Sequence, residues 1–146
     1  MVRIKQRYIL FDILSPPSRE HWEAYSESRD SALLHLHQVS SNEISAKHLL
    51  QVIRQVLQDH YGDFGAGSAG ILLVVKYFSP KTSTGIIRCG RQHLDMIVAV
   101  LALINRLGDK EVIMRCIHVS GTIKKCENVS MKRDREDIIR MQRRRK

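Results

Sequence analysis

The order in which hydrophobic periodicity changes along this chain is the feature that most constrains its fold. Residues 2–13, 70–78, 84–89 and 112–119 are alternating or continuous apolar runs, which predict four strands. Residues 44–61 and 94–107 carry apolar side chains at helical spacing, which predicts two long helices. The expected order is therefore strand, helix, strand, strand, helix, strand.

Two βαβ halves joined by a central hairpin at residues 79–83 are typical of an α+β fold of the ferredoxin-like, RRM-like kind. We expect one four-stranded antiparallel sheet with two helices on one face, and an extra basic C-terminal helix that begins near residue 122. The length of 146 residues suits a single domain, assigned here to residues 1–130, followed by a basic helix or tail at residues 131–146. Gly62 is expected to be a left-handed cap after the first long helix.

An acidic insertion is expected at about residues 15–44. Prolines 16 and 17 end the first strand because they cannot continue a ladder. Residues 14–45 contain two basic and five acidic residues, a net charge of −3, and a short helix is expected at about residues 31–38.

The net charge of +9 is concentrated at the end of the chain. Residues 121–146 hold ten Lys or Arg against four acids, or +6. A basic excess of this size indicates a polyphosphate partner, and a nucleic acid in particular. Aromatic residues are 5% of the chain, and residues 84–89 contain none. We therefore expect recognition of the backbone and shape of structured RNA rather than stacking of bases on the sheet.

The candidate RNA contacts are cations and a helix start. Arg3, Lys5 and Arg7 share one face of the first strand. The alternative interpretation is that they are solvated charges that protect the end of a strand. Ser120, Gly121 and Thr122 precede two lysines at a helix N-terminus, which suits a phosphate but also describes an ordinary cap. Further cations lie near the third strand and in the hairpin loop. The full set is Arg3, Lys5, Arg7, Lys81, Arg88, Arg91, Ser120, Gly121, Thr122, Lys124 and Lys125.

The second long helix is apolar on all sides. One face covers the sheet, whereas the other, with Met96, Val100 and Leu103, would meet water in a monomer. A protein partner is the preferred interpretation of these three residues. Cover by the acidic insertion is the alternative.

Catalysis by the isolated chain is not expected. Only His118 is followed two residues later by Ser or Thr, and His-x-Ser/Thr phosphoesterases need two such histidines. Cys89, Cys116 and Cys126 form no C-x-x-C pair, and His35 and His37 have no third ligand at usual spacing, so no metal site is expected. We expect an intracellular protein, since the cysteine pattern indicates reduced thiols. We expect it to be soluble and without a membrane partner, since the longest apolar run is nine residues.

Several separate motifs, in order and at fitting spacing, resemble one known family. They are residues 1–11 (MVRIKQRYILF), 63–65 (DFG), 76–78 (KYF), 84–89 (TGIIRC) and 119–125 (VSGTIKK). Over residues 1–13 and about 45–130 the chain resembles the fifth "processing of precursor" protein subunit of ribonuclease P and ribonuclease MRP. Residues 15–17 (SPP) and 81–85 (KTSTG) are most similar to the fungal members.

This resemblance implies a subunit that binds the catalytic RNA for removal of pre-tRNA 5′ leaders and, in the MRP particle, for pre-rRNA processing. It also implies a TIM-barrel-like partner subunit, a second small subunit of related fold, and a location in the nucleus and nucleolus. The RNA would carry the chemistry, with Mg²⁺ held mainly by RNA phosphates and no cofactor bound by the protein. Residues 143–146 (RRRK) depart from the acidic tail of some members, and no family role transfers to them.

Two other functions remain compatible with the sequence. The chain would be a protein interaction module with incidental RNA contact if the second helix recruits its partners. It would be a stand-alone RNA phosphoesterase if His118 supported cleavage by the purified protein.

Overall fold

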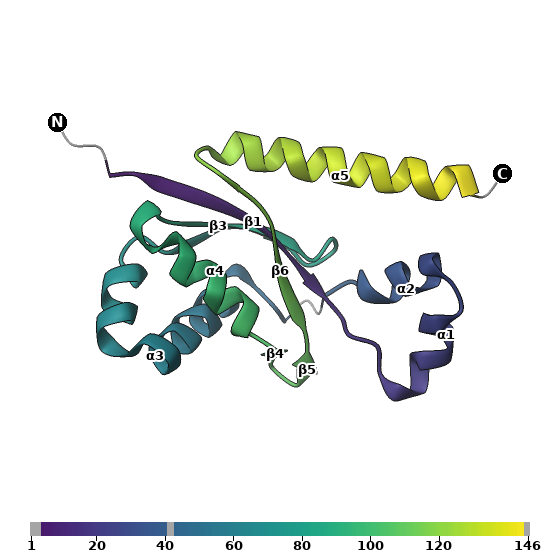
Figure 1. Cartoon of the computed structure of the whole chain (residues 1–146), viewed down its shortest axis with the longest axis horizontal. Helices are drawn as coiled ribbons and strands as arrows, with labels where there is room; N and C mark the ends of the chain where they lie inside the picture. The colour runs from purple at the N-terminus through teal and green to yellow at the C-terminus, as the bar shows by residue number, and fades with distance from the viewer. Residues whose placement is uncertain (1–3, 41–42, 145–146) are drawn as a thin grey trace.

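The computed structural model describes residues 4–40 and 43–144, and its centre is a four-stranded sheet (Figure 1). The strands stand in the order β2-β3-β1-β6, and every neighbouring pair is antiparallel. Their bounds are Gln6–Leu14 for β1, Val74–Ser79 for β2, Thr84–Gly90 for β3 and Ile113–Ser120 for β6. The expected α+β class and four-stranded antiparallel sheet are therefore confirmed. The expected first strand is wrong at its start, because residues 4 and 5 precede β1.

Two helices cover one face of the sheet (Figure 1). Helix α3 (Ala46–Gly70) begins at Ser45, whose side chain accepts a hydrogen bond from the His48 amide. Gly62 has a positive φ of 69°, but its ψ of −168° lies outside the left-handed helical region that was expected of a cap. The chain then returns to helical conformation instead of entering a loop. The result is a kinked helix whose second segment, residues 63–70, folds back beside α4 (Leu94–Leu103).

The second helix ends four residues earlier than expected. Ile104 is extended, and the next residues form a small hairpin of β4 (Arg106–Leu107) and β5 (Lys110–Glu111). Gly108 supplies the positive φ of 62° that this turn requires. Leu107 lies in this hairpin and is buried. Its apolar side chain follows the helix at helical spacing, which explains why the sequence pattern extended the helix to residue 107.

The main core lies between the sheet and these two helices. Ile9, Phe11 and Ile13 alternate along β1 and point into it, as period-two patterning requires. They pack against the buried stripe of α3, Leu49, Ile53 and Leu57, and against α4.

The apolar side of α4 that was assigned to a partner is partly closed by α3. Val100 is completely buried, so the expectation that it meets water in a monomer is wrong. Met96 is half-buried, with its Sδ 3.7 Å from the position that a Cβ on Gly65 would take. Leu103 remains 46% exposed. The cover comes from the segment of α3 after Gly62, and the insertion lies on the other side of the molecule (Figure 1).

Helix α5 (Ile123–Arg144) covers the opposite face of the sheet (Figure 1). A second cluster forms there from Leu10, Ile86 and Cys126, with Tyr8, Ile117, Ile123 and Val129 packed against it. Tyr8 and Phe11 thus lie on opposite faces of the sheet. An RRM stacks bases on the face that α5 covers in this protein.

The acidic insertion forms a 3₁₀ turn at Arg19–His21 and two short helices, α1 (Trp22–Ser26) and α2 (Arg29–Leu36). The expected helix at residues 31–38 corresponds to α2. His35 is on this helix and His37 follows it, so they share no strand face. None of the helices in the described part of the chain is both long enough and apolar enough to cross a membrane.

Candidate nucleic-acid interface

Three neighbouring strands bring candidate residues to one end of the sheet. Tyr8 on β1 lies opposite Arg88 on β3 and opposite Ser120 on β6. Residues directly opposite in an antiparallel sheet point to the same face, so Arg88 and Ser120 flank Tyr8 on the side of α5. The sequence separations are large, and only the strand register brings these residues together.

The N-terminus of α5 stands at this same end. Thr122 caps the helix, since its Oγ1 accepts a hydrogen bond from the Lys125 amide at 3.4 Å. The Ser120 hydroxyl accepts one from the Thr122 amide at 3.3 Å. Amides of a first helical turn lack intrahelical acceptors, and exposed Lys124 and Lys125 follow directly, so the helix start favours an anion.

Further cations lie at this end of the sheet. The Arg7 guanidinium donates a hydrogen bond to the Gln6 carbonyl at 2.9 Å, and its Nη1 is 3.8 Å from the position that a Cβ on Gly121 would take. The Arg91 amide donates to the Lys5 carbonyl at 3.0 Å. Lys5 and Arg91 therefore adjoin each other beside the paired ends of β1 and β3. We call the group Lys5, Arg7, Arg88, Arg91, Lys124 and Lys125 the basic end.

Arg88 has an unusual environment within the basic end. Its Nε is buried and has no hydrogen-bond partner among the described residues. A buried guanidinium N–H without an acceptor is costly, and most such groups are paired in folded proteins. An anionic ligand at the helix start is one source of the missing acceptor.

Two of the cations among the expected RNA contacts are not part of this group. Arg3 lies outside the described residues. Lys81 is in the turn between β2 and β3, at the other end of β3, which places it about 20 Å from the basic end at about 3.3 Å per residue.

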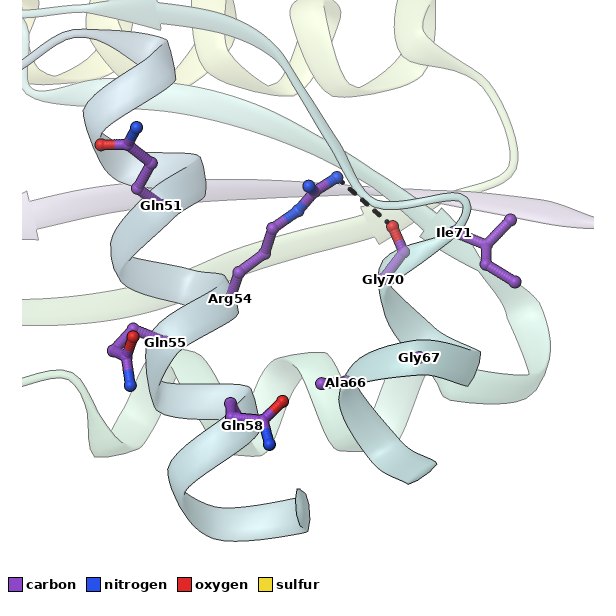
Figure 2. Close-up of a pocket in the computed structure, with 8 residues that line it drawn as sticks. All are labelled: Gln51, Arg54, Gln55, Gln58, Ala66, Gly67, Gly70 and Ile71. Carbon is purple, nitrogen blue, oxygen red and sulfur yellow. Dashed lines mark hydrogen bonds between the residues drawn. The ribbon is translucent and has the colours of Figure 1, made fainter. Parts of the chain in front are cut away.

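Two cavities of about 730 Å³ lie near α3, and only one adjoins the basic end. That cavity is lined by Lys5, Arg91 and His93 together with exposed apolar side chains, Ile4 and Ile71. The other lies between the two segments of α3, with three glutamines on one side and small residues on the other (Figure 2). Its one cation, Arg54, donates to the Gly70 carbonyl at 3.5 Å, so this cavity has no cluster of free cations (Figure 2). Sequence reasoning identified neither cavity, because both depend on where the chain turns at residues 62 and 70–72.

Burial raises the pKa of Cys89 to about 11, and burial also raises the pKa values of Cys116 and Cys126, so the thiols are neutral near pH 7. Within residues 4–40 and 43–144, no three His, Cys, Asp or Glu side chains are grouped to hold a metal ion. His118 lies on β6 opposite Leu10.

An α+β domain with cations gathered beside a helix start is typical of proteins that bind nucleic acids. The Rpp14/Pop5 family matches this chain over residues 7–131, and the chain belongs to that family. The resemblance found in the sequence motifs is thereby confirmed.

Individual relatives support the same assignment. The chain is 45% identical over 135 residues to "Ribonuclease P/MRP protein subunit POP5" of Saccharomyces cerevisiae, covering 92% of this chain and 78% of the relative. It is 41% identical over 138 residues to the protein of the same name in Schizosaccharomyces pombe, covering 94% and 91%. A chain in a cryo-EM structure of yeast ribonuclease MRP has a similar fold, with a TM-score of 0.51, 11% identity, and coverage of 94% and 97%.

Proposed function

We propose that this protein is a subunit of ribonuclease P, and of ribonuclease MRP, that binds and stabilises the catalytic RNA through its basic end. Membership of the Rpp14/Pop5 family is the observation that carries the proposal. The convergence of Arg7, Arg88 and the start of α5 supports the assignment of the RNA site.

Binding would be directed at the RNA backbone. Cations and first-turn amides offset the repulsion between phosphates that folding brings close together, and they release condensed counterions. Because α5 covers the face of the sheet that includes Tyr8, base stacking on that face is not part of the proposed mode.

The RNA would carry the chemistry of pre-tRNA cleavage, with Mg²⁺ held mainly by its phosphates. We further propose the ferredoxin-like arrangement for the sheet and its two crossover helices, which the strand order β2-β3-β1-β6 supports. A TIM-barrel-like subunit and a second small subunit are the proposed protein partners, and the nucleus and nucleolus the proposed location.

A filter-binding titration with ribonuclease P RNA at increasing salt tests the proposal. The variant Arg7→Gln/Lys124→Gln/Lys125→Gln should bind more weakly, and its log–log salt slope should fall by roughly 1 for each lost phosphate contact. The control variant Arg19→Gln/Lys47→Gln/Lys110→Gln loses the same charge from exposed, scattered positions and should keep most of the slope. A wild-type affinity that does not depend on salt would contradict the proposal.

A further inference from the structure

The acidic and basic residues of helix α5 are distributed unevenly around the helix axis. One sector of about 100° along its 22 residues contains no acidic residue. The cations of this sector, which we call the α5 stripe, are Lys124, Lys125, Lys132, Arg135 and Arg143. Asn128, Ile139 and Gln142 complete the sector, whereas all four acids of the helix lie outside it.

The stripe faces away from the rest of the molecule. Ile123, Cys126 and Val129 pack on the sheet from the opposite side of the helix, and the side chain of Cys126 is completely buried there. All five cations of the stripe are exposed. Figure 1 shows α5 above the sheet, so the side of the helix opposite its packed residues, which carries the stripe, forms an outer surface.

Cations of α5 outside the stripe have acidic neighbours. Arg144 forms an ion pair with Asp30 of α2, and the charge of Arg140 also acts on Asp30. Arg133 lines a small cavity together with Asp134 and Asp137. None of the five stripe cations makes an ion pair within the described residues. Five cations without an ion pair are thus gathered on one outward surface of α5.

Both ends of α5 are held in place. The Thr122 cap and the apolar cluster with Cys126 fix its start, and the Arg144–Asp30 pair ties its end to the insertion. The stripe then extends about 28 Å from Lys124 to Arg143, at about 1.5 Å per residue. Because the fold already orders a surface of this length, the protein loses little conformational entropy when it binds a long, regular ligand.

We infer that the α5 stripe binds the phosphate backbone of a double-helical RNA segment, as a continuation of the basic end; this rests on the proposed function. Lys124 and Lys125 belong to both surfaces, so one RNA can contact the two together. Single-strand sites use aromatic side chains for stacking, and the stripe contains none. Duplex RNA is recognised mostly through phosphates, 2′-hydroxyls and shape, for which lysine, arginine and amide side chains are suited.

The test uses the full-length protein with a duplex RNA of about 16 base pairs and a single strand of equal length. The variant Lys132→Gln/Arg135→Gln/Arg143→Gln leaves the N-terminal part of α5 intact. Its salt slope on the duplex should fall by roughly two to three, and its preference for the duplex over the single strand should be lost. The charge-retaining variant Lys132→Arg/Arg135→Lys/Arg143→Lys should bind like the wild type.

Two controls separate the effect of the stripe cations from the effects of net charge and of apolar contact. The scattered variant at Arg19, Lys47 and Lys110 measures the effect of net charge alone. Ile138→Ser, on the flank of the stripe, should leave duplex affinity unchanged if the ligand contacts the cations alone. Circular dichroism establishes that each variant retains its helix content.

An equal slope for the stripe variant and the scattered control would overturn the inference, as would equal affinity for single strand and duplex. Displacement of the duplex by polyglutamate at matched charge would instead assign the stripe to an acidic protein. If the wild type binds ribonuclease P RNA with a steep slope that the stripe variant preserves, only this inference fails. If the wild type binds no RNA, the proposed function fails with it.

Discussion

Arg88→Met is expected to stabilise the protein and weaken RNA binding at once. Methionine keeps the apolar stem of the side chain but removes the buried Nε that has no partner in the described region. An unsatisfied buried polar group costs about 1–3 kcal/mol, and Arg88 is only half-buried, so we expect a gain of about 1 kcal/mol. For a chain of this size that corresponds to about 3 °C in Tm. Loss of one phosphate contact should reduce the salt slope by about 1.

Urea unfolding and filter binding measure the two effects on the same protein. Arg19→Met, at an exposed position in the insertion, is the matched control and should change neither quantity appreciably. A less stable Arg88→Met protein would show that Arg88 supports the fold. Unchanged RNA affinity would remove Arg88 from the site, and either result would refute the reasoning.

Three other substitutions and two measurements on Cys89 test the packing. Gly85→Ala should lower the free energy of unfolding by about 1–3 kcal/mol in urea, because its Cβ would lie 2.6 Å from the Tyr77 carbonyl oxygen. Val100→Asp should lower Tm severely, since it buries a charge. Leu103→Asp, at a half-exposed position, should lower the free energy of unfolding by less than about 1 kcal/mol. Similar losses of stability for the two variants would contradict the packing of α3 on α4. Cys89 should resist iodoacetamide at pH 7.5 until urea unfolds the protein, with labelling read by mass spectrometry. Its pKa is raised from 9.0 to about 11, so stability should also decline as pH rises through that interval.

Periodicity predicted the elements well where one pattern was uninterrupted. The alternation in residues 2–13 predicted a strand, and the structure places Ile9 and Phe11 together on its core face. The helical spacing in residues 44–61 predicted a helix with one apolar stripe, which is buried at Leu49, Ile53 and Leu57. These outcomes depend on local geometry, since a strand or helix fixes the direction of each side chain relative to its neighbours.

Contacts between distant segments were beyond the reach of these patterns. Gly62 was expected to end a helix, but the helical segment after it packs against α4 and helps to close the face with Val100. The all-apolar pattern of α4 indicated burial on two sides without showing that the same chain supplies the second cover. For this reason, the prediction assigned too much of the surface of α4 to contact with a protein partner.

In the candidate RNA site, too, the local features could be predicted from the sequence and the contacts between distant segments could not. A capped, basic start of α5 was readable from Ser120 to Lys125, and the structure confirms the cap. The position of Arg88 opposite Tyr8 follows from strand register, and Lys81 is set apart for the same reason. Conversely, the outward stripe of α5 becomes evident only once its buried face is known.

Direct RNA contact in cells is the central claim, and cross-linking tests it most directly. The tagged full-length chain is irradiated with ultraviolet light, purified under denaturing conditions, and its attached RNA sequenced. We predict enrichment of the ribonuclease P and MRP RNAs, with a clear loss for Arg7→Gln/Lys124→Gln/Lys125→Gln and none for the scattered control. Absence of both RNAs, or equal recovery with the two variants, would contradict the claim.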